Sequence, residues 1–301
     1  MMLLPKALTI FFTVFTLSVL GQQDPLFASE GQRSFWFNPA SIGTFNSYSI
    51  NSIGRKQWVG ADGSPASIEL NGALKYLKIG GKDIPFSAGA IGLGYRYETV
   101  GFFRSHVVTV PLNMQFKLSN TYLSIGVSPG IQNLSFEGVW IPPTPEPDPI
   151  IPPYTSTSQT KFTTGAGIQW YGRNFSIGFA STHLLQESFD EINYDARRHY
   201  YLNGSYLHSF SDEFALQAIA VARTDAGITS VQGLISAVLG SKNKMSVGLG
   251  YRNGNALIGA LTARFDRFYC GYFVEYFNSI LYNGGFSHEF RVAFELFDKN
   301  L

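Results

Sequence analysis

The stretch that determines the fold class lies near the C-terminus, where residues 290–296 read Phe-Arg-Val-Ala-Phe-Glu-Leu. Every second residue is a large apolar one, while the residues between them are charged or small, and Glu289 extends the polar face. Alternation with a period of two residues is typical of a β-strand that separates an apolar from a polar environment. The segment therefore predicts a strand with two different solvents on its two faces.

The same alternation recurs along most of the chain, whereas a helical period of 3.6 residues is absent from windows of similar length. It gives about fourteen segments of roughly ten residues each, the length of a tilted membrane-spanning strand. We expect these strands at approximately 46–57, 64–76, 86–98, 103–117, 121–136, 159–171, 173–182, 197–210, 213–223, 228–239, 244–253, 256–265, 268–278 and 283–297. The pattern predicts an all-β protein, a transmembrane antiparallel β-barrel of the outer membrane over residues 46–301.

The connections between these strands alternate in length. Three of them are tight turns, at Leu118–Asn120, Phe210–Asp212 and Phe265–Arg267. The two longest, 138–158 and 183–196, fall at the opposite end of the predicted barrel. Short periplasmic turns and long external loops are expected of an even-stranded barrel with both termini in the periplasm.

One of the long connections is rich in proline. Residues 141–153 read Ile-Pro-Pro-Thr-Pro-Glu-Pro-Asp-Pro-Ile-Ile-Pro-Pro. Such a tract favours extended polyproline II, which needs no internal hydrogen bonds. We expect an extracellular loop at 138–158 that serves either as a stiff arm for docking a partner or as an exposed spacer.

Composition supports a membrane barrel over a secreted β-sandwich or propeller. Charged residues make up 14% of the chain and aromatic residues 15%, whereas soluble domains average about 25% charged residues. A barrel instead turns an apolar, aromatic-rich face to lipid. The net charge of +1 does not indicate nucleic acid as a partner.

The N-terminus has the features of a secretory signal peptide. Lys6 precedes an apolar run over residues 7–20, and a polar stretch opens at Gln22. The run is shorter than the roughly 20 apolar residues that span a bilayer. We therefore expect a cleaved signal peptide at 1–21 and, at 22–45, a segment that either plugs the barrel or lies in the periplasm.

Catalytic and metal-binding motifs are not apparent in the sequence. Five histidines, His106, His183, His199, His208 and His288, are scattered without metal-ligand spacing. Cys270 is the single cysteine, so an internal disulfide and a cysteine-based zinc cluster are excluded. Ser181-Thr182-His183 with Asp190 suggests a hydrolytic site, but it lacks the glycine elbow of a nucleophile. The sequence predicts no enzyme, no cofactor and no metal.

The polar faces of the predicted strands carry charges of both signs. They are Arg55, Glu69, Arg96, Glu98, Arg223, Arg252, Arg264, Glu275, Glu289 and Arg291. Opposite charges favour a filled, salt-bridged interior over an ion-selective pore, and Phe273 and Phe277 on the same face agree. We expect Arg55 to pair with Glu69 on the neighbouring strand.

Two groups of residues carry a more specific signal. The first group is Asn38-Pro39, followed by Arg55, Gln57, Trp58, Gly60, Gly63 and Pro65 in a block R-x-Q-W-x-G-x-x-G-x-P. The second group is Tyr251-Arg252 and Ser287-His288-Glu289. With these motifs the chain closely resembles the PorP/SprF family, outer-membrane proteins of the type IX secretion system, over the whole mature chain.

The resemblance implies a non-catalytic outer-membrane component that supports secretion or surface anchoring of one adhesin or other cargo, connected with adhesion and gliding motility. The implied partners are cargo with a type IX C-terminal signal, the translocon, the periplasmic ring and outer-membrane lipid. The alternative is a passive channel or hydrophobic-solute transporter. The motif residues themselves either hold the barrel together or face a partner, since Gly-Trp-Pro corners are first of all geometric devices.

Overall fold

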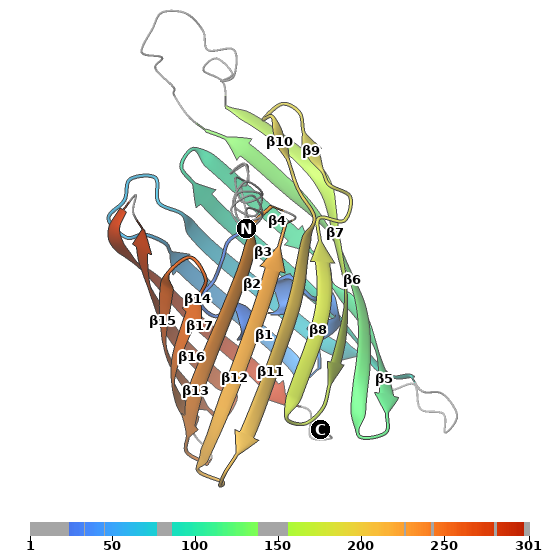
Figure 1. Cartoon of the computed structure of the whole chain (residues 1–301). Helices are drawn as coiled ribbons and strands as arrows, with labels where there is room; N and C mark the ends of the chain where they lie inside the picture. The colour runs from blue at the N-terminus through green and yellow to red at the C-terminus, as the bar shows by residue number, and fades with distance from the viewer. Residues whose placement is uncertain are drawn as a thin grey trace, which may run out of the picture.

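A computed structural model describes residues 24–32, 34–44, 46–76, 86–137, 156–225, 227–241, 244–279 and 282–297. Most of them lie in β-strands, and the main sheet wraps into one closed barrel (Figure 1). Three short 3-10 helices, η1 (Glu30–Gln32), η2 (Ser34–Trp36) and η3 (Pro39–Ser41), precede the first strand. Among the described residues, no helix is long and apolar enough to cross a membrane.

The strands follow one another around the barrel in sequence order. Their bounds are β1 (Asn46–Lys56), β2 (Ala66–Tyr76), β3 (Phe86–Val100), β4 (Phe103–Thr109), β5 (Leu112–Leu118), β6 (Thr121–Phe136), β7 (Thr157–Tyr171), β8 (Phe175–Thr182), β11 (His199–Ser209), β12 (Phe214–Thr224), β13 (Thr229–Leu239), β14 (Lys244–Arg252), β15 (Ala256–Phe265), β16 (Phe268–Ser279) and β17 (Tyr282–Phe297). All strand pairs among the described residues are antiparallel, and β1 pairs with β17 to close the wall. Because β4 and β5 are two parts of one strand, the described barrel has 14 strands, as the sequence predicts.

The predicted strand ends differ from the observed ones by at most two residues. The main departure is a break between β4 and β5, where the sequence predicts one strand over 103–117. Pro111 lies at this break and has no N–H to donate to the ladder. Its carbonyl still accepts a bond from Gly92 N at 2.8 Å, so the wall stays closed there.

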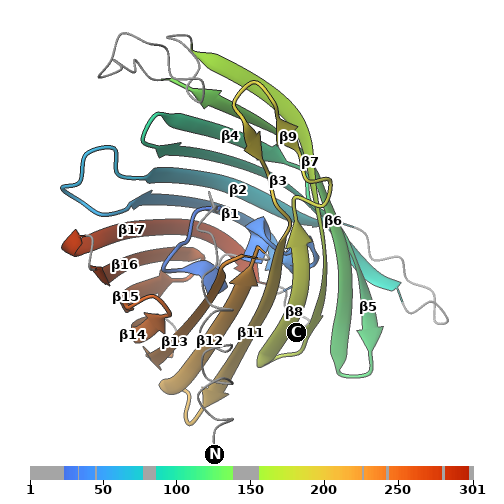
Figure 2. The ribbon, with the colours of Figure 1, turned by 45° about the horizontal axis from the view of Figure 1, so that its top comes forward.

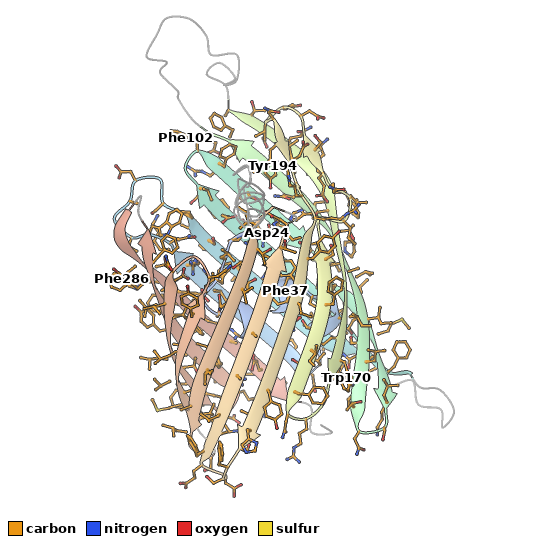
Figure 3. The ribbon with its side chains drawn as sticks, in the orientation of Figure 1. Asp24, Phe37, Phe102, Trp170, Tyr194 and Phe286 are labelled. Atoms are coloured by element: carbon orange, nitrogen blue, oxygen red, sulfur yellow. The ribbon has the colours of Figure 1, made fainter. Side chains whose placement is uncertain are left out.

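The two faces of the wall differ as the alternation predicts. Apolar side chains such as Leu249 (77% exposed) and Phe290 (62%) cover the outer face. Figure 3 shows Trp170 and Phe286 pointing outward in the same way. Most inward-facing positions are polar or small, with Glu69 and Gln115 fully enclosed, and a few, such as Phe273, are apolar. The outer face is therefore the lipid-facing one.

The two ends of the barrel are also unlike. A small hairpin of β9 (Ser188–Phe189) and β10 (Tyr194–Asp195) folds at one end, above β7 (Figure 1). Its Phe189 packs with Leu134 and Ala196 in a small apolar cluster. Tight turns join the strands at the other end. Since long loops face outward in such barrels, we call these the outer and the periplasmic end.

Candidate functional site

Residues 24–32 and 34–44 lie inside the ring of strands (Figure 2), and many of their side chains are buried there. Phe27, Ala28, Phe37, Asn38 and Ala40 are at most 2% exposed. Figure 3 shows Asp24 and Phe37 within the ring of strands. We call residues 24–32 and 34–44 the lumen segment. The contacts between the segment and the wall form the candidate functional site.

Glu289 on β17 holds the segment by its backbone. Its carboxylate accepts hydrogen bonds from Ala28 N at 2.8 Å and from Ser29 N at 3.3 Å. The Ser29 hydroxyl donates to the same carboxylate. Glu289 is fully buried, and a carboxylate that accepts several N–H and O–H bonds is stable in such a site.

Two arginines and a second glutamate complete this arrangement. Arg55 Nη1 lies 3.5 Å from Glu289 Oε2, and Arg55 Nη2 lies 3.3 Å from Glu275 Oε2. Arg252 Nη1 lies 3.0 Å from Glu275 Oε1. Arg252 also donates to the carbonyl of Phe27 at 2.8 Å. We call Arg55, Arg252, Glu275 and Glu289 the clamp network.

The clamp network brings two positive and two negative charges together where water is excluded. Isolated charges are costly to bury, but here each one has a partner of opposite sign. Gln232 on β13 adds a neutral link, since it donates to Ala28 O at 2.7 Å and accepts from Arg252. The lumen segment is thus bound through its own peptide groups, independently of most of its side chains.

The partners of Arg55 differ from the expected one. In the register of the sheet Arg55 faces Ser67 on β2 and Glu289 on β17. Glu69 lies opposite Ile53 on one side and Arg96 on the other. The carboxylates against Arg55 therefore come from β16 and β17, because the closure of the barrel brings the last strands next to the first.

A second anchor lies around Asn38, further along the segment. Its side-chain oxygen caps η3 by accepting from Ala40 N at 3.1 Å. Its amide donates to Gln169 Oε1 at 2.8 Å and to the carbonyl of Ile168 at 3.3 Å. Pro39 follows at the first helical position, where its missing N–H costs nothing. The Asn-Pro pair thus turns the chain and fixes it to β7.

Small wall residues let this turn lie close to the strands. A Cβ atom placed on Gly126 of β6 would lie 2.6 Å from Ala40 N and 2.6 Å from Pro39 C. Backbone at that distance cannot move aside as a flexible side chain can. Glycine is therefore required at Gly126 by the closeness of the segment.

The segment starts at the outer mouth of the barrel. There Asp24 contacts one residue of β3, one of β12 and one that directly follows β8. Arg96 on β3 approaches its carboxylate at 3.1 Å, and His183 Nε2 lies 3.4 Å from the same oxygen. Arg223 at the end of β12 donates to the Asp24 carbonyl at 2.8 Å. On the far side of the imidazole, His183 Nδ1 lies 3.1 Å from Glu187.

These contacts govern the protonation of Asp24 and His183. Burial alone would raise the pKa of the Asp24 carboxyl, but Arg96 and His183 outweigh it and hold that pKa well below its ordinary value. Burial alone would lower the pKa of His183, but Asp24 and Glu187 outweigh it and raise the pKa to about 9. At neutral pH His183 thus shares its two protons with two carboxylates.

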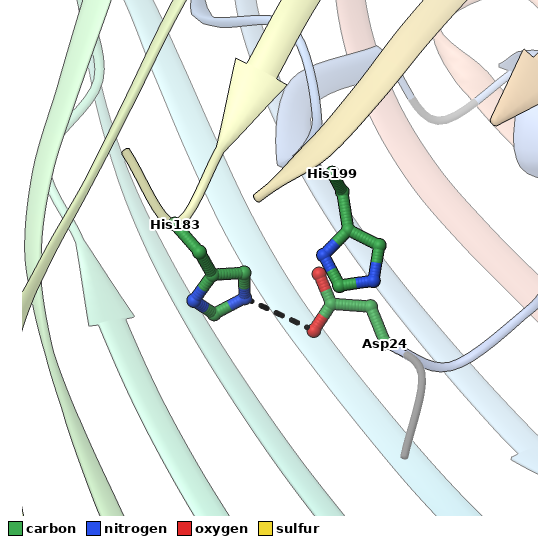
Figure 4. A group of neighbouring side chains, drawn as sticks. All are labelled: Asp24, His183 and His199. Atoms are coloured by element: carbon green, nitrogen blue, oxygen red, sulfur yellow. Dashed lines mark hydrogen bonds and ion pairs between the residues drawn. The ribbon is translucent and has the colours of Figure 1, made fainter. Parts of the chain in front are cut away.

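His199, the first residue of β11, lies beside this pair (Figure 4). The donor atoms of Asp24, His183 and His199 all lie within 4.8 Å of one another. Among the residues that the structure describes, these three form a group with the donor types of a metal site.

A cavity of about 320 Å³ lies below the segment, toward the periplasmic end. Its wall is polar and includes Asn51, Asn71 and Asn203, together with Arg291 and Glu295. The segment contributes Gly31, Phe35 and residues 41–44 to its lining. The interior is therefore filled toward the outer end and roomier below.

Comparison with known proteins identifies the family. The family model described as "Type IX secretion system membrane protein PorP/SprF" matches residues 19–294. The chain belongs to the PorP/SprF family. As a family member with a barrel fold it is an outer-membrane component of the type IX secretion system. Among curated proteins, none matches the chain.

Solved structures with a similar arrangement are outer-membrane barrels of low sequence identity. Omp33 of Acinetobacter baumannii is 9% identical, with 84% of this chain and 100% of that chain covered and a TM-score of 0.48. The toluene transporter TbuX of Ralstonia pickettii is 11% identical, with 94% and 97% covered and a TM-score of 0.49. The toluene transporter TodX of Pseudomonas putida is 9% identical, with 87% and 92% covered and a TM-score of 0.46.

The PorP/SprF motif residues occupy three kinds of position. Two of them, Asn38 and Pro39, belong to the lumen segment. Three more, Arg55, Arg252 and Glu289, belong to the clamp network that binds it. Because they are far apart in sequence, the block pattern gives no sign that they converge. The structure brings them to one interior and leaves the other motif residues at the rim or on the lipid face.

At the rim the family block R-x-Q-W-x-G-x-x-G-x-P forms the connection from β1 to β2. Gln57 N donates to Pro65 O at 2.9 Å, and Trp58 N donates to Ser287 Oγ at 3.2 Å. Gly60 (φ +97°) and Gly63 (φ +68°) adopt left-handed backbone that favours glycine. This corner thus ties the first hairpin to the closing strand β17.

Tyr251 and His288 lie on the outer face, one residue away from inward-facing Arg252 and Glu289 in each case. Tyr251 is 50% exposed toward lipid. His288 Nδ1 lies 2.7 Å from the Tyr272 hydroxyl on β16. The strand period therefore divides each family motif between an interior contact and a lipid-facing position.

The sequence patterns do not predict that Asp24, His183 and His199 meet at the outer mouth. His183 and His199 are 16 positions apart with a loop between them, and Asp24 comes from the far N-terminus. The signal that could have found them is topological, because His183 directly follows β8 and His199 begins β11, its neighbour in the sheet. The predicted signal peptide and the proline-rich tract 141–153 lie outside the described residues.

Proposed function

We propose that this chain is a non-catalytic component of the type IX secretion system that supports secretion or surface anchoring of one specific adhesin or other cargo protein. The observation that carries the proposal is the lumen segment bound across the barrel interior by the clamp network. A barrel whose interior is occupied in this way acts through its rim and its partners rather than by conducting solutes.

The chemistry of the interior supports a non-catalytic role. The best hydrolytic candidate was Ser181-Thr182-His183 with Asp190, but both ring nitrogens of His183 lie against carboxylates, those of Asp24 and Glu187. Asp190 accepts instead from Ser188 at 2.9 Å. A base that serves a nucleophilic hydroxyl needs a hydrogen bond to it.

We also propose that residues 1–21 are a cleaved signal peptide and that the mature chain starts near Gln22. This start would leave Asp24 as an early residue of the mature chain, free to enter the barrel from its end. N-terminal sequencing of the purified protein tests it, and an intact Met1 would contradict it.

The cargo is identified by affinity purification of the tagged, full chain from detergent-solubilised outer membranes of its native host, followed by mass spectrometry. An unrelated tagged barrel of the same membrane is the control. We expect one large surface protein that the control does not recover, with or without translocon subunits. Recovery of the barrel alone, with steady solute conductance in planar bilayers, would establish the channel alternative instead.

A gene deletion then separates secretion from anchoring. If the protein supports secretion, the identified cargo accumulates in the periplasm of the deletion strain. If it supports anchoring, the cargo appears in the medium. Normal display of the cargo on the surface of the deletion strain would contradict both forms of the proposal.

A further inference from the structure

Three potential metal ligands converge at the outer mouth from three separate parts of the chain. Asp24 belongs to the lumen segment, His183 follows β8, and His199 begins β11. Their donor atoms lie within 4.8 Å of one another. Figure 4 shows both imidazole rings directed toward the Asp24 carboxylate.

His199 gives an independent reason to look for a ligand here. The residue is 3% exposed, and within the described part of the chain neither of its ring nitrogens finds a hydrogen-bond partner. Buried polar groups are nearly always satisfied, so such a ring calls for an explanation. A metal ion bound to one nitrogen would supply it.

His183 already has the environment of a metal-binding histidine. Its Nδ1 is held by Glu187 at 3.1 Å, which directs Nε2 toward Asp24. A carboxylate behind the imidazole is the usual second partner of a metal-ligating histidine, because it fixes the ring and raises its basicity. The proton now shared between His183 and Asp24 would be displaced by the metal.

We propose that Asp24, His183 and His199 bind one divalent first-row transition-metal ion, with Zn²⁺ as the best match. Two imidazole nitrogens and one carboxylate suit such an ion, and three protein ligands leave one further position for water. Metal–ligand distances of about 2.0–2.2 Å require donor atoms about 3.3 Å apart. His183 Nε2 and Asp24 Oδ1 already lie 3.4 Å apart.

Charges of both signs lie around the group, and Arg223 donates to the Asp24 carbonyl at 2.8 Å. The Asp24 and Glu187 carboxylates together balance the two charges of the ion. Arg96 stays next to Asp24 at 3.1 Å and is itself opposite Glu69 in the sheet. The bound ion would fasten the first residues of the lumen segment to two elements of the barrel wall, whatever cargo the barrel serves.

The test uses the full-length barrel, purified in detergent with a histidine-free tag, stripped with EDTA and then dialysed against buffer with or without Zn²⁺. Metal content is measured by mass spectrometry of the ions, and folding by the heat-dependent shift of the barrel in gel electrophoresis. We expect one Zn²⁺ per folded wild-type chain. His199→Leu and His183→Gln should each weaken Zn²⁺ binding at least tenfold, and His208→Gln, at the periplasmic end, should leave it unchanged.

A second measurement keeps the proposal testable if His183→Gln fails to fold. In EDTA, His199→Leu should be as resistant to heat as the wild type, because the ring nitrogens have no hydrogen bond to lose and leucine keeps the site filled. With Zn²⁺ only the wild type should gain resistance and show slower hydrogen exchange over residues 24–30. Equal Zn²⁺ binding by wild type and His199→Leu, or no Zn²⁺-dependent change in the wild type, would overturn the proposal.

Discussion

The outer and periplasmic halves of the barrel interior are built differently. Toward the outer end, the clamp network binds the lumen segment through paired charges that are at most 5% exposed at their side chains. Toward the periplasm, a polar cavity of about 320 Å³ lies between residues 41–44 of the segment and the inner faces of β1 and β17. The segment is thus fixed at one end and has space beside it at the other.

This difference indicates which half seals the barrel. Buried ion pairs add little stability over an apolar core of the same size, but removing one partner is costly because it strands the other charge. The outer half therefore resists displacement of the segment, whereas the periplasmic half tolerates change. Four variants test this contrast between the two halves, and they follow in order of the expected effect, from the largest to the smallest.

Glu289→Ala should have the largest effect. It leaves Arg55 and Arg252 to share the single carboxylate of Glu275, so that one buried positive charge is uncompensated. It also removes the acceptor of Ala28 N and Ser29 N. We expect a loss of about 3–5 kcal/mol in the free energy of unfolding, the cost of leaving a buried charge unpaired. Urea unfolding of the reconstituted barrel, followed by tryptophan fluorescence, measures it.

Glu213→Ala, in the exposed turn before β12, is the matched control and should change the unfolding free energy by less than about 0.5 kcal/mol. Similar losses in the two variants would mean that Glu289 does not clamp the segment.

A disulfide that locks the segment to the wall should come next. A Cβ atom on Gly31 would lie 3.5 Å from Ile219 Cβ on β12, within the range of about 3.5–4.5 Å that disulfides require. Gly31→Cys with Ile219→Cys, combined with Cys270→Ser, should stabilise the oxidised barrel by about 2–4 kcal/mol relative to the reduced one.

If the segment is a permanent part of the barrel, the disulfide-bonded variant should recover cargo as efficiently as the same variant in reduced form. Each single cysteine variant serves as a control for the substitutions themselves. If the double-cysteine variant recovers cargo when reduced but not when oxidised, the segment must leave the lumen for cargo to bind.

Gly126→Ala should have a smaller effect that is still clearly measurable. The added Cβ meets backbone of Pro39 and Ala40 at 2.6 Å, so the η3 turn must shift. We expect a loss of about 1–3 kcal/mol, as for overpacking elsewhere. Gly233→Ala, whose Cβ meets nothing within 4 Å, is the control; an equal loss there would make the effect one of strand propensity.

Gly204→Ala should have the smallest effect. Gly204 lines the periplasmic cavity, and its added Cβ would meet only Ser176 O, at 3.8 Å. We expect a change below about 0.5 kcal/mol and unaltered hydrogen exchange over the lumen segment. A loss as large as that of Gly126→Ala would show that the two halves of the interior are equally tight.

The wall of this barrel follows from patterns that are local in the sequence. Each strand is defined by its own alternation, and each tight turn by its own residues, as at Phe265–Arg267 between β15 and β16. The faces of Arg252 and Glu289 follow from the same period of two. These features are local, so no knowledge of distant residues was needed to predict them.

The contents of the interior depend on contacts that exist only in the folded barrel. The lumen segment has no alternation of its own, and its position depends on contacts with residues as distant as Glu289. Closure of the barrel, which sets β17 beside β1, brings Arg55 to Glu289 rather than to Glu69. Pairing of β8 with β11 sets His183 near His199, and the lumen segment brings Asp24 to both. Such contacts arise between residues far apart in sequence, and spacing along the chain does not encode them.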